Sequence, residues 1–299
     1  MMMVTRLMVL AGLITLPGSC NPAVPVKQQP KASPVQVAAK PVPPPVVAIG
    51  AFKLNRAPQQ GSLSLGSVPP GTRRLVVNGQ DVPFAPDGRF VVGFGREYDA
   101  TAVMVAFLDG GRTVSERQPV LKRAWKIENL ATVRRFSEPD AVFQARRPGE
   151  LAQINAARRM GVSSEGWRQR FIWPAKGRIS GFFGSQRIYA GEPGAPHSGV
   201  DVAGPTGAPV IAPADGVVTL AAASPFSLEG NLLIIDHGMG LDSAFLHLSK
   251  IHVKKGDIIR QGQLVGAIGA TGRASGPHLH WGMKWNQERI DPQPLAGPM

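Results

Sequence analysis

The sequence predicts a mainly β protein whose two folded parts are joined by a short helical connector. Of its 299 residues, 35 are glycine and 28 are proline, a mixture that favours turns and short strands over long helices. Turn dipeptides such as Asn78-Gly79, Asp87-Gly88 and Asp109-Gly110 separate runs rich in β-branched residues. A hydrophobic fraction of 43% can bury a core, and the length is typical of about two domains.

Residues 1–20 have the pattern of a secretory signal peptide. Arg6 precedes an apolar run from Leu7 to Leu16, which is too short to cross a hydrocarbon core that needs about 20 residues. Cys20, the single cysteine of the chain, follows small residues directly behind this run. The pattern indicates export, and it suggests a bacterial lipoprotein in which Cys20 becomes the acylated first residue. An ordinary cleaved signal with a leftover thiol is the alternative.

Residues 21–48 are rich in proline, alanine, valine and lysine, and we expect them to form an extended, semi-rigid tether. The regular turn signals of residues 49–126 then predict a small antiparallel β-sandwich that serves as a spacer or binding domain. This segment contains no histidine.

Residues 127–170 are predicted to form a basic helical connector. Pro148-Gly149 is expected to divide it, with a helix from Glu150 to Met160. Arginine pairs recur at intervals of twelve, at Arg134-Arg135, Arg146-Arg147 and Arg158-Arg159. We interpret them as a solvated helix face, because no aromatic residues alternate with them as a nucleic-acid surface would require.

The net charge of +13 is unevenly distributed. Residues 1–170 hold 23 basic and 11 acidic residues, whereas residues 171–299 hold 10 and 9. Bulk positive potential therefore does not drive the chemistry of the C-terminal part, and no nucleic-acid partner is expected.

The histidines lie in this C-terminal part, 171–299. Proline and glycine around the segment from His197 to Asp201 argue against a continuous helix. Fully extended, the four steps would span about 13 Å, too far for both side chains to reach one ion at about 2 Å from each donor atom. If both bind one metal the segment bends, and Gly199 is where a bend costs least.

A second histidine segment reads His278-Leu279-His280, and His247 occupies a further strand-like run. On a strand, residues two apart face the same side, so His278 and His280 can enter one cleft while Leu279 enters the core. Two histidines, one carboxylate and a water form the ligand set of a catalytic zinc site. Four histidines for two ligand positions leave two for proton transfer, and the spacing does not decide which.

These residues resemble the lysostaphin-type (LytM-like) zinc metallo-endopeptidases of bacterial cell walls. The similarity covers about residues 171–292 and includes GRISGFFGSQR, HSGVDVAGPTGAPVIAPADGVV, VKKGDIIRQGQLVGAIGATGRASGPHLHW and the closing Asp291-Pro292. It implies an antiparallel β-sheet peptidase domain. The upstream sandwich resembles, less specifically, an all-β domain that precedes the peptidase in some Gram-negative members.

The resemblance also implies roles for individual residues. Zinc would be bound by His197, Asp201 and His280, with His247 and His278 as the catalytic pair. One of the pair would take a proton and pass it to the leaving amine, and the other would donate to the oxyanion.

Two tyrosine positions of the family differ here. Phe245 stands where relatives often have a tyrosine, and Tyr189 is not at a matching offset in the loop before the first ligand. Arg187, Gln186 and Tyr189 are candidate substrate contacts, and a structural role for Arg187 is the alternative.

The predicted function is an exported peptidoglycan hydrolase that cleaves peptide bonds in stem peptides or cross-links. Its predicted location is the periplasm, with anchoring to the outer membrane through Cys20, since Asn21 replaces the aspartate associated with inner-membrane retention. The alternative is a non-catalytic wall protein that binds peptidoglycan or activates an amidase. A carrier-domain interpretation of the hairpins leaves the histidines unexplained.

Overall fold

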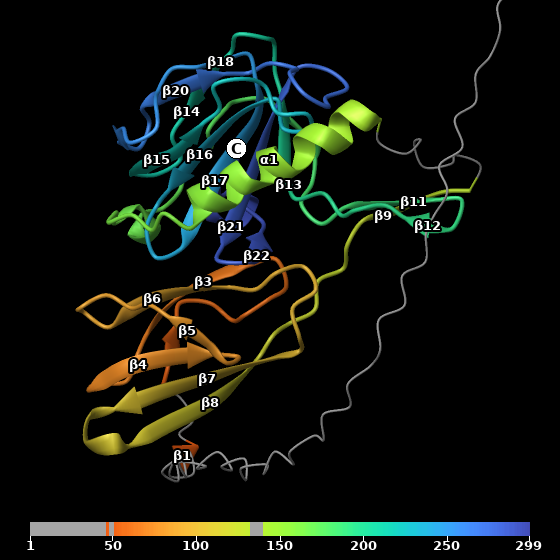
Figure 1. Ribbon diagram of the computed structural model, residues 1–299. Helices are drawn as coiled ribbons and strands as arrows, with labels where there is room; N and C mark the ends of the chain where they lie inside the picture. Colours follow the sequence, from red (N-terminus) through yellow and green to blue (C-terminus); the bar gives the residue numbers. More distant parts are fainter. Residues whose placement is uncertain (1–45, 48–50, 132–139) are drawn as a thin grey trace, which may run out of the picture. The chain divides into compact units, whose positions relative to one another are not determined.

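The computed structural model describes residues 46–47, 51–131 and 140–299, and this part of the chain is mainly β (Figure 1). The predicted signal peptide, Cys20 and most of the predicted tether lie outside the described residues. The end of the predicted tether is not a linker, because Val46–Val47 form strand β1, which pairs in parallel with Val114 and Ser115. No helix within the described ranges is long and apolar enough to cross a membrane.

The N-terminal part contains two sheets, as its turn signals predict. One has the strand order β1-β8-β7-β4-β5, with β8 at Thr113–Pro119, β7 at Thr101–Leu108, β4 at Thr72–Val77 and β5 at Gln80–Val82. The other has the order β2-β3-β6, with β2 at Lys53–Leu54, β3 at Leu63–Ser67 and β6 at Arg89–Gly93. Alternate residues of β7 are buried, the period expected for a strand with one face in a core.

The C-terminal part is built on one large sheet with the order β10-β13-β21-β17-β16-β15-β19, and β22 pairs with β21. The bounds are β10 Arg178–Gly181, β13 Gly199–Ala203, β21 His278–Trp285, β17 Leu241–Leu248, β16 Asn231–Asp236, β15 Gly216–Ala221, β19 Ile258–Ile259 and β22 Glu288–Ile290. Its neighbouring strands are antiparallel, as predicted.

Two small sheets complete the fold. One has the order β12-β11-β9, with β9 at Ile127–Leu130, β11 at Gln186–Tyr189 and β12 at Glu192–Pro193. The other has the order β14-β20-β18, with β14 at Pro209–Ile211, β18 at Lys250–Ile251 and β20 at Leu264–Ala267. Short helices lie at Asp109–Gly111 (η1), Gly166–Arg168 (η2) and Gln293–Ala296 (α2).

Helix α1 (Ala141–Arg158) begins at Asp140, whose side chain accepts a hydrogen bond from the amide of Phe143 at 2.7 Å. The predicted division at Pro148-Gly149 is wrong, because the helix runs through both residues. A proline inside a helix removes one backbone hydrogen bond. Burial of Ile154 and Ala157 against the sheet offsets this loss.

One arginine of each described pair, Arg147 and Arg158, is not part of a solvated face, which corrects the sequence interpretation for these two, whereas Arg146 and Arg159 are exposed as expected. Arg147 contacts both carboxylate oxygens of Glu229, at 2.7 and 2.8 Å, and Arg158 contacts Asp242 at 3.3 Å. The pair Arg134-Arg135 lies outside the described residues. Figure 1 shows α1 across β15, β16 and β17, and these ion pairs fix the helix to that face.

The two folded parts share one hydrophobic core. A Cβ at Gly93, in β6, would lie 2.9 Å from the Cβ of Trp285, so the absence of a side chain at Gly93 permits this contact. Arg123 forms an ion pair of 2.8 Å with Asp291, whose side chain is 1% exposed. The sandwich is therefore packed on the peptidase sheet through both apolar and charged contacts.

A buried polar chain lies in the large sheet. The indole N–H of Trp281 donates to Ser243 Oγ at 3.2 Å, and Ser243 Oγ lies 2.9 Å from His237 Nε2. The Nδ1 of His237 is 2.7 Å from the carbonyl of Asp215, so this nitrogen carries the proton and Ser243 donates to Nε2. His237 is thus a satisfied structural histidine, and burial lowers its pKa to about 4.

Replacement of Arg123 by Met should destabilise the chain by about 3 kcal/mol, because the Asp291 carboxylate would stay buried without its cation. The matched control is Arg73→Met, at the exposed pair with Asp109, which should cost less than about 1 kcal/mol. Urea unfolding measures both values, and equal losses would contradict the buried role of Asp291.

The stability of the chain should depend on pH through His237. Between pH 6.5 and 4 the unfolded chain binds a proton at this ring that the folded chain excludes, so stability falls as the pH falls. The loss approaches about 3 kcal/mol at pH 4. The variant His237→Asn removes the titrating ring, so its difference in unfolding free energy from the wild type should shrink as the pH falls from 6.5 to 4. A difference that stays constant over this range would disprove the lowered pKa of His237.

Candidate metal centre

The candidate ligands lie on neighbouring strands β13 and β21. Asp201 is directly opposite His280 in the antiparallel register of the two strands. His197 lies just before β13, and residues 194–198 belong to no strand. Gly199 thus lies inside β13, and the two side chains meet because His197 is supplied by the irregular segment that precedes this strand.

Three donor atoms of these residues converge. His280 Nδ1 lies 2.9 Å from Asp201 Oδ1 and 3.1 Å from His197 Nε2, and His197 Nε2 lies 3.2 Å from Asp201 Oδ1. Four tetrahedral ligands at about 2.1 Å from zinc are about 3.4 Å apart. The triangle formed by the three atoms is thus close to the size that one zinc ion requires.

The remaining hydrogen bonds of the two rings are compatible with a metal at the centre of this triangle. His197 Nδ1 is 3.1 Å from the carbonyl of Phe182, so it donates its proton there. His280 Nε2 is 3.4 Å from Ser198 Oγ, which can accept the proton of this nitrogen when Nδ1 binds a metal. With a metal bound, these outer hydrogen bonds would leave one lone pair on each of the three inner atoms, and outer partners that fix the tautomer accompany metal-binding histidines.

Protonation also suits metal binding. Burial lowers the pKa of His280, which favours the neutral ring. Burial acts to raise the pKa of Asp201, but hydrogen bonds from His197 and His280 outweigh it and keep the carboxylate ionised. Burial acts to lower the pKa of His197, and the hydrogen bond and charge of Asp201 outweigh it and raise this pKa, so protons compete with a metal for this ring.

Two glycines make room for the ligands. A Cβ at Gly181 would lie 2.3 Å from Asp201 Oδ2, and a Cβ at Gly199 would lie 2.3 Å from the carbonyl of Trp281. A side chain at either position would displace a ligand or its strand. Gly199 is therefore needed for close approach of β13 to β21.

His247 reaches this cluster through a β-bulge. Leu246 of β17 lies opposite His280, so in a regular strand His247 would face away from the ligands. The register between β16 and β17 shifts beside His247, and its φ of 64° is left-handed. A bulge re-aims a side chain; the His247 ring lies 4.8 Å from the His278 ring, centroid to centroid.

Both histidines outside the ligand triangle have one nitrogen fixed by a backbone carbonyl. His247 Nδ1 lies 2.8 Å from the carbonyl of Thr271, and His278 Nδ1 lies 2.8 Å from that of Gly276. In the neutral form of each ring the lone pair therefore lies on Nε2, and that of His278 is 3.7 Å from Asp201 Oδ1. Burial lowers the pKa of His247 to about 4, so this ring is neutral at pH 7.

The candidate substrate contacts lie on β11. Gln186 donates to the carbonyl of Gly194 at 2.7 Å and accepts from Arg96 at 3.1 Å, and Arg187 forms an ion pair with Glu128 at 2.8 Å. Tyr189 pairs with Glu192 in the same small sheet. These contacts hold β11 in its small sheet, and substrate binding by the three residues stays a prediction.

The structure also adds site features that the sequence did not indicate. Ser198 and the carbonyls of Phe182, Thr271 and Gly276 fix the histidine rings. Ser198 is adjacent to a candidate ligand, a signal that could have identified it, whereas no side-chain pattern identifies a carbonyl. Phe245 is fully buried in the core, opposite Trp281. A hydroxyl at this position would therefore lie in the core and not among the candidate ligands.

Known proteins resemble the C-terminal part of the chain. Residues 195–292 match the model of Peptidase family M23. The peptidoglycan DD-endopeptidase ShyA of Vibrio cholerae is 44% identical over 114 residues, which cover 38% of this chain and 26% of that protein. The DD-carboxypeptidase/endopeptidase Mpg of Neisseria meningitidis is 38% identical over 102 residues, which cover 34% of this chain and 23% of that protein.

This chain spans about a quarter of the length of those curated relatives. A crystal structure from Pseudomonas aeruginosa assigned to peptidase M23 extends the likeness to 82% of this chain and 97% of that chain, with a TM-score of 0.63 and 28% identity. Together with the sheet and the ligand triangle, these similarities show that the C-terminal part of the chain is a peptidase family M23 domain of the LytM type.

Proposed function

We propose that this protein is a zinc-dependent peptidoglycan hydrolase that cleaves peptide bonds in stem peptides or cross-links. His197, Asp201 and His280 would hold the zinc. The observation that carries the proposal is the convergence of their three donor atoms, 2.9 to 3.2 Å apart, inside a peptidase family M23 domain. When bound, zinc acts as a Lewis acid and lowers the pKa of water beside it.

His247 and His278 are the proposed proton-transfer pair. Their Nδ1 protons are held by carbonyls, which leaves Nε2 free to accept a proton. One ring takes a proton at Nε2 from the attacking water as its oxygen bonds to the scissile carbonyl carbon, and returns that proton to the amine as the C–N bond breaks. The other, once protonated, donates to the carbonyl oxygen as negative charge develops there.

The substrate and the location are part of the same proposal. One relative is named a peptidoglycan DD-endopeptidase and another a DD-carboxypeptidase/endopeptidase, which supports a peptide substrate from the cell wall. Such a substrate requires export, and the signal-like residues 1–20 agree with this. We place the protein in the periplasm, with Cys20 as the site of lipid attachment to the outer membrane.

The purified chain should bind about one zinc ion, and His197→Ala or His280→Ala should abolish that binding because each removes one of three protein ligands. Metal analysis after dialysis measures the zinc content. His252→Ala is the matched control, since this exposed histidine lies outside the ligand triangle. Full zinc occupancy in His280→Ala would refute the ligand assignment.

His278→Gln and His247→Asn should keep their zinc yet lose activity on purified peptidoglycan by about 100-fold or more, because they lack the proton-transfer nitrogen. Asparagine suits residue 247 because it tolerates the left-handed backbone of His247. Release of soluble muropeptides measures the activity. Wild-type rates in both zinc-loaded variants would exclude the pair from catalysis.

A further inference from the structure

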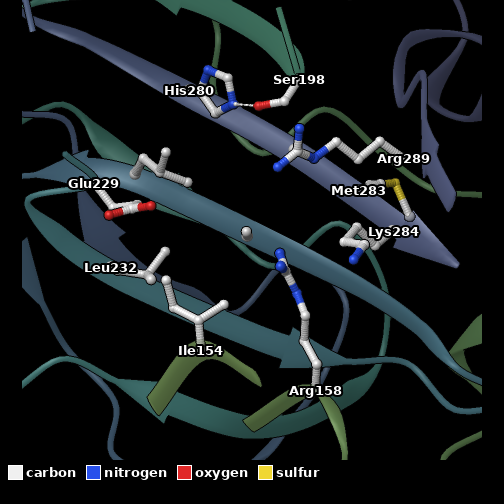
Figure 2. A pocket seen from close by; sticks show the side chains of 12 residues that line it. Ile154, Arg158, Ser198, Glu229, Leu232, His280, Met283, Lys284 and Arg289 are labelled. Atoms are coloured by element: carbon white, nitrogen blue, oxygen red, sulfur yellow. Dashed lines mark hydrogen bonds between the residues drawn. The ribbon is translucent and has the colours of Figure 1, made fainter. Parts of the chain in front are cut away.

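A pocket beside the metal centre is lined by three basic side chains. Arg158 comes from the end of α1, Lys284 from β21 and Arg289 from β22. Figure 2 shows the guanidinium groups of Arg158 and Arg289 directed into the pocket. Its volume of about 80 Å³ is several times the ~10–15 Å³ that one water needs.

The register of the sheet makes these charges unusual. Lys284 lies directly opposite Arg289 across β21 and β22, and like charges in that position repel. On the other side Lys284 lies opposite Asp242, but this carboxylate forms its ion pair with Arg158. Within residues 51–131 and 140–299, neither Lys284 nor Arg289 forms an ion pair.

The acidic groups near the pocket are already engaged. Glu229 lines it, but both of its oxygens contact Arg147. Among the described residues, the half-buried ammonium of Lys284 and the exposed guanidinium of Arg289 therefore have no ion-pair partner of their own, and Asp242, Glu288 and Glu229 act on them only from a longer distance. Burial lowers the pKa of both groups, with the positive charge of Arg158 as a further cause, and an anion between them would relieve this repulsion.

The pocket adjoins the metal centre at one candidate ligand, His280. His280 and its hydrogen-bond partner Ser198 line the same pocket. Lys284 follows His280 by four residues on one strand, a separation of about 13 Å along β21. A peptide that extends along this strand from the metal centre would bring a residue several positions from the scissile bond to the basic side chains.

We propose that Arg158, Lys284 and Arg289 form a subsite for a free carboxylate on the substrate peptide. The inference rests on the proposed hydrolase function and adds the substrate class, an acidic peptide. A guanidinium binds a carboxylate through two parallel hydrogen bonds, and the ammonium adds a third donor. Arg158 also holds Asp242, so Lys284 and Arg289 are the specific test positions.

The test uses zinc-loaded chain and soluble cross-linked muropeptides, either native or with their carboxylates converted chemically to amides. The wild type should have a KM about tenfold lower for the native form. Lys284→Met and Arg289→Gln should each raise that KM about tenfold, with little change in kcat and none on the amidated form. The matched control Arg159→Gln removes an exposed charge next to Arg158 and should change neither value.

A structural role for these cations predicts a different result. Removal of one repelling charge should keep or raise the melting temperature of Lys284→Met, whereas a structural cation would lower it. Equal wild-type KM values for both substrate forms, or equal effects of the variants on both, would overturn the subsite.

Failure of the proposed function gives a separate outcome. If the zinc-loaded wild type cleaves neither substrate, calorimetric binding of the same two muropeptide forms decides the subsite. Tighter binding of the native form that is lost in Lys284→Met supports it, and equal Kd values for the two forms refute it.

Discussion

The pairing of Asp201 with His280 across β13 and β21 determines the geometry of the metal centre. Directly opposite residues of antiparallel strands bring their side chains close without any loop. Backbone hydrogen bonds of the sheet therefore hold two of the three candidate ligands, and only His197 is supplied by an irregular segment. Ligands on a rigid sheet keep their separation when substrate binds, which suits a site whose donor atoms must stay within a few tenths of an ångström.

The sequence predicted the parts of this site that depend on local spacing. The two-residue interval between His278 and His280 places both rings on one face, and the structure confirms it. The position of His247 depends on a register shift against another strand, which no local pattern reveals. Pro148 lies within a helix because sheet residues distant in the sequence cover the C-terminal end of that helix. Helix propensity, which depends on local sequence, does not include those contacts.

The ion pairs of the helix arginines likewise depend on contacts that local sequence does not reveal. Arg147 and Arg158 look solvated in a sequence because their partners, Glu229 and Asp242, are about 80 residues away along the chain. Once the helix is on the sheet, these arginines link it to the face that carries the histidines. The connector is thus part of the peptidase fold, and the shared core through Gly93 and Trp285 extends this integration to the sandwich.

The hydrogen bond from Trp281 to Ser243 has a consequence for how β21 finds its place during folding. A slip of one residue would exchange the histidine face for the core face and is opposed by hydrophobicity. A slip of two residues would preserve that alternation, so apolar burial alone would not reject it. It would, however, move the buried indole N–H away from Ser243 Oγ, its acceptor in the described part of the chain, while Ser243 would stay bonded to His237. Trp281 therefore helps to select the register of β21. A two-residue slip keeps the apolar residues buried, but it is unfavourable because the indole N–H loses its hydrogen bond.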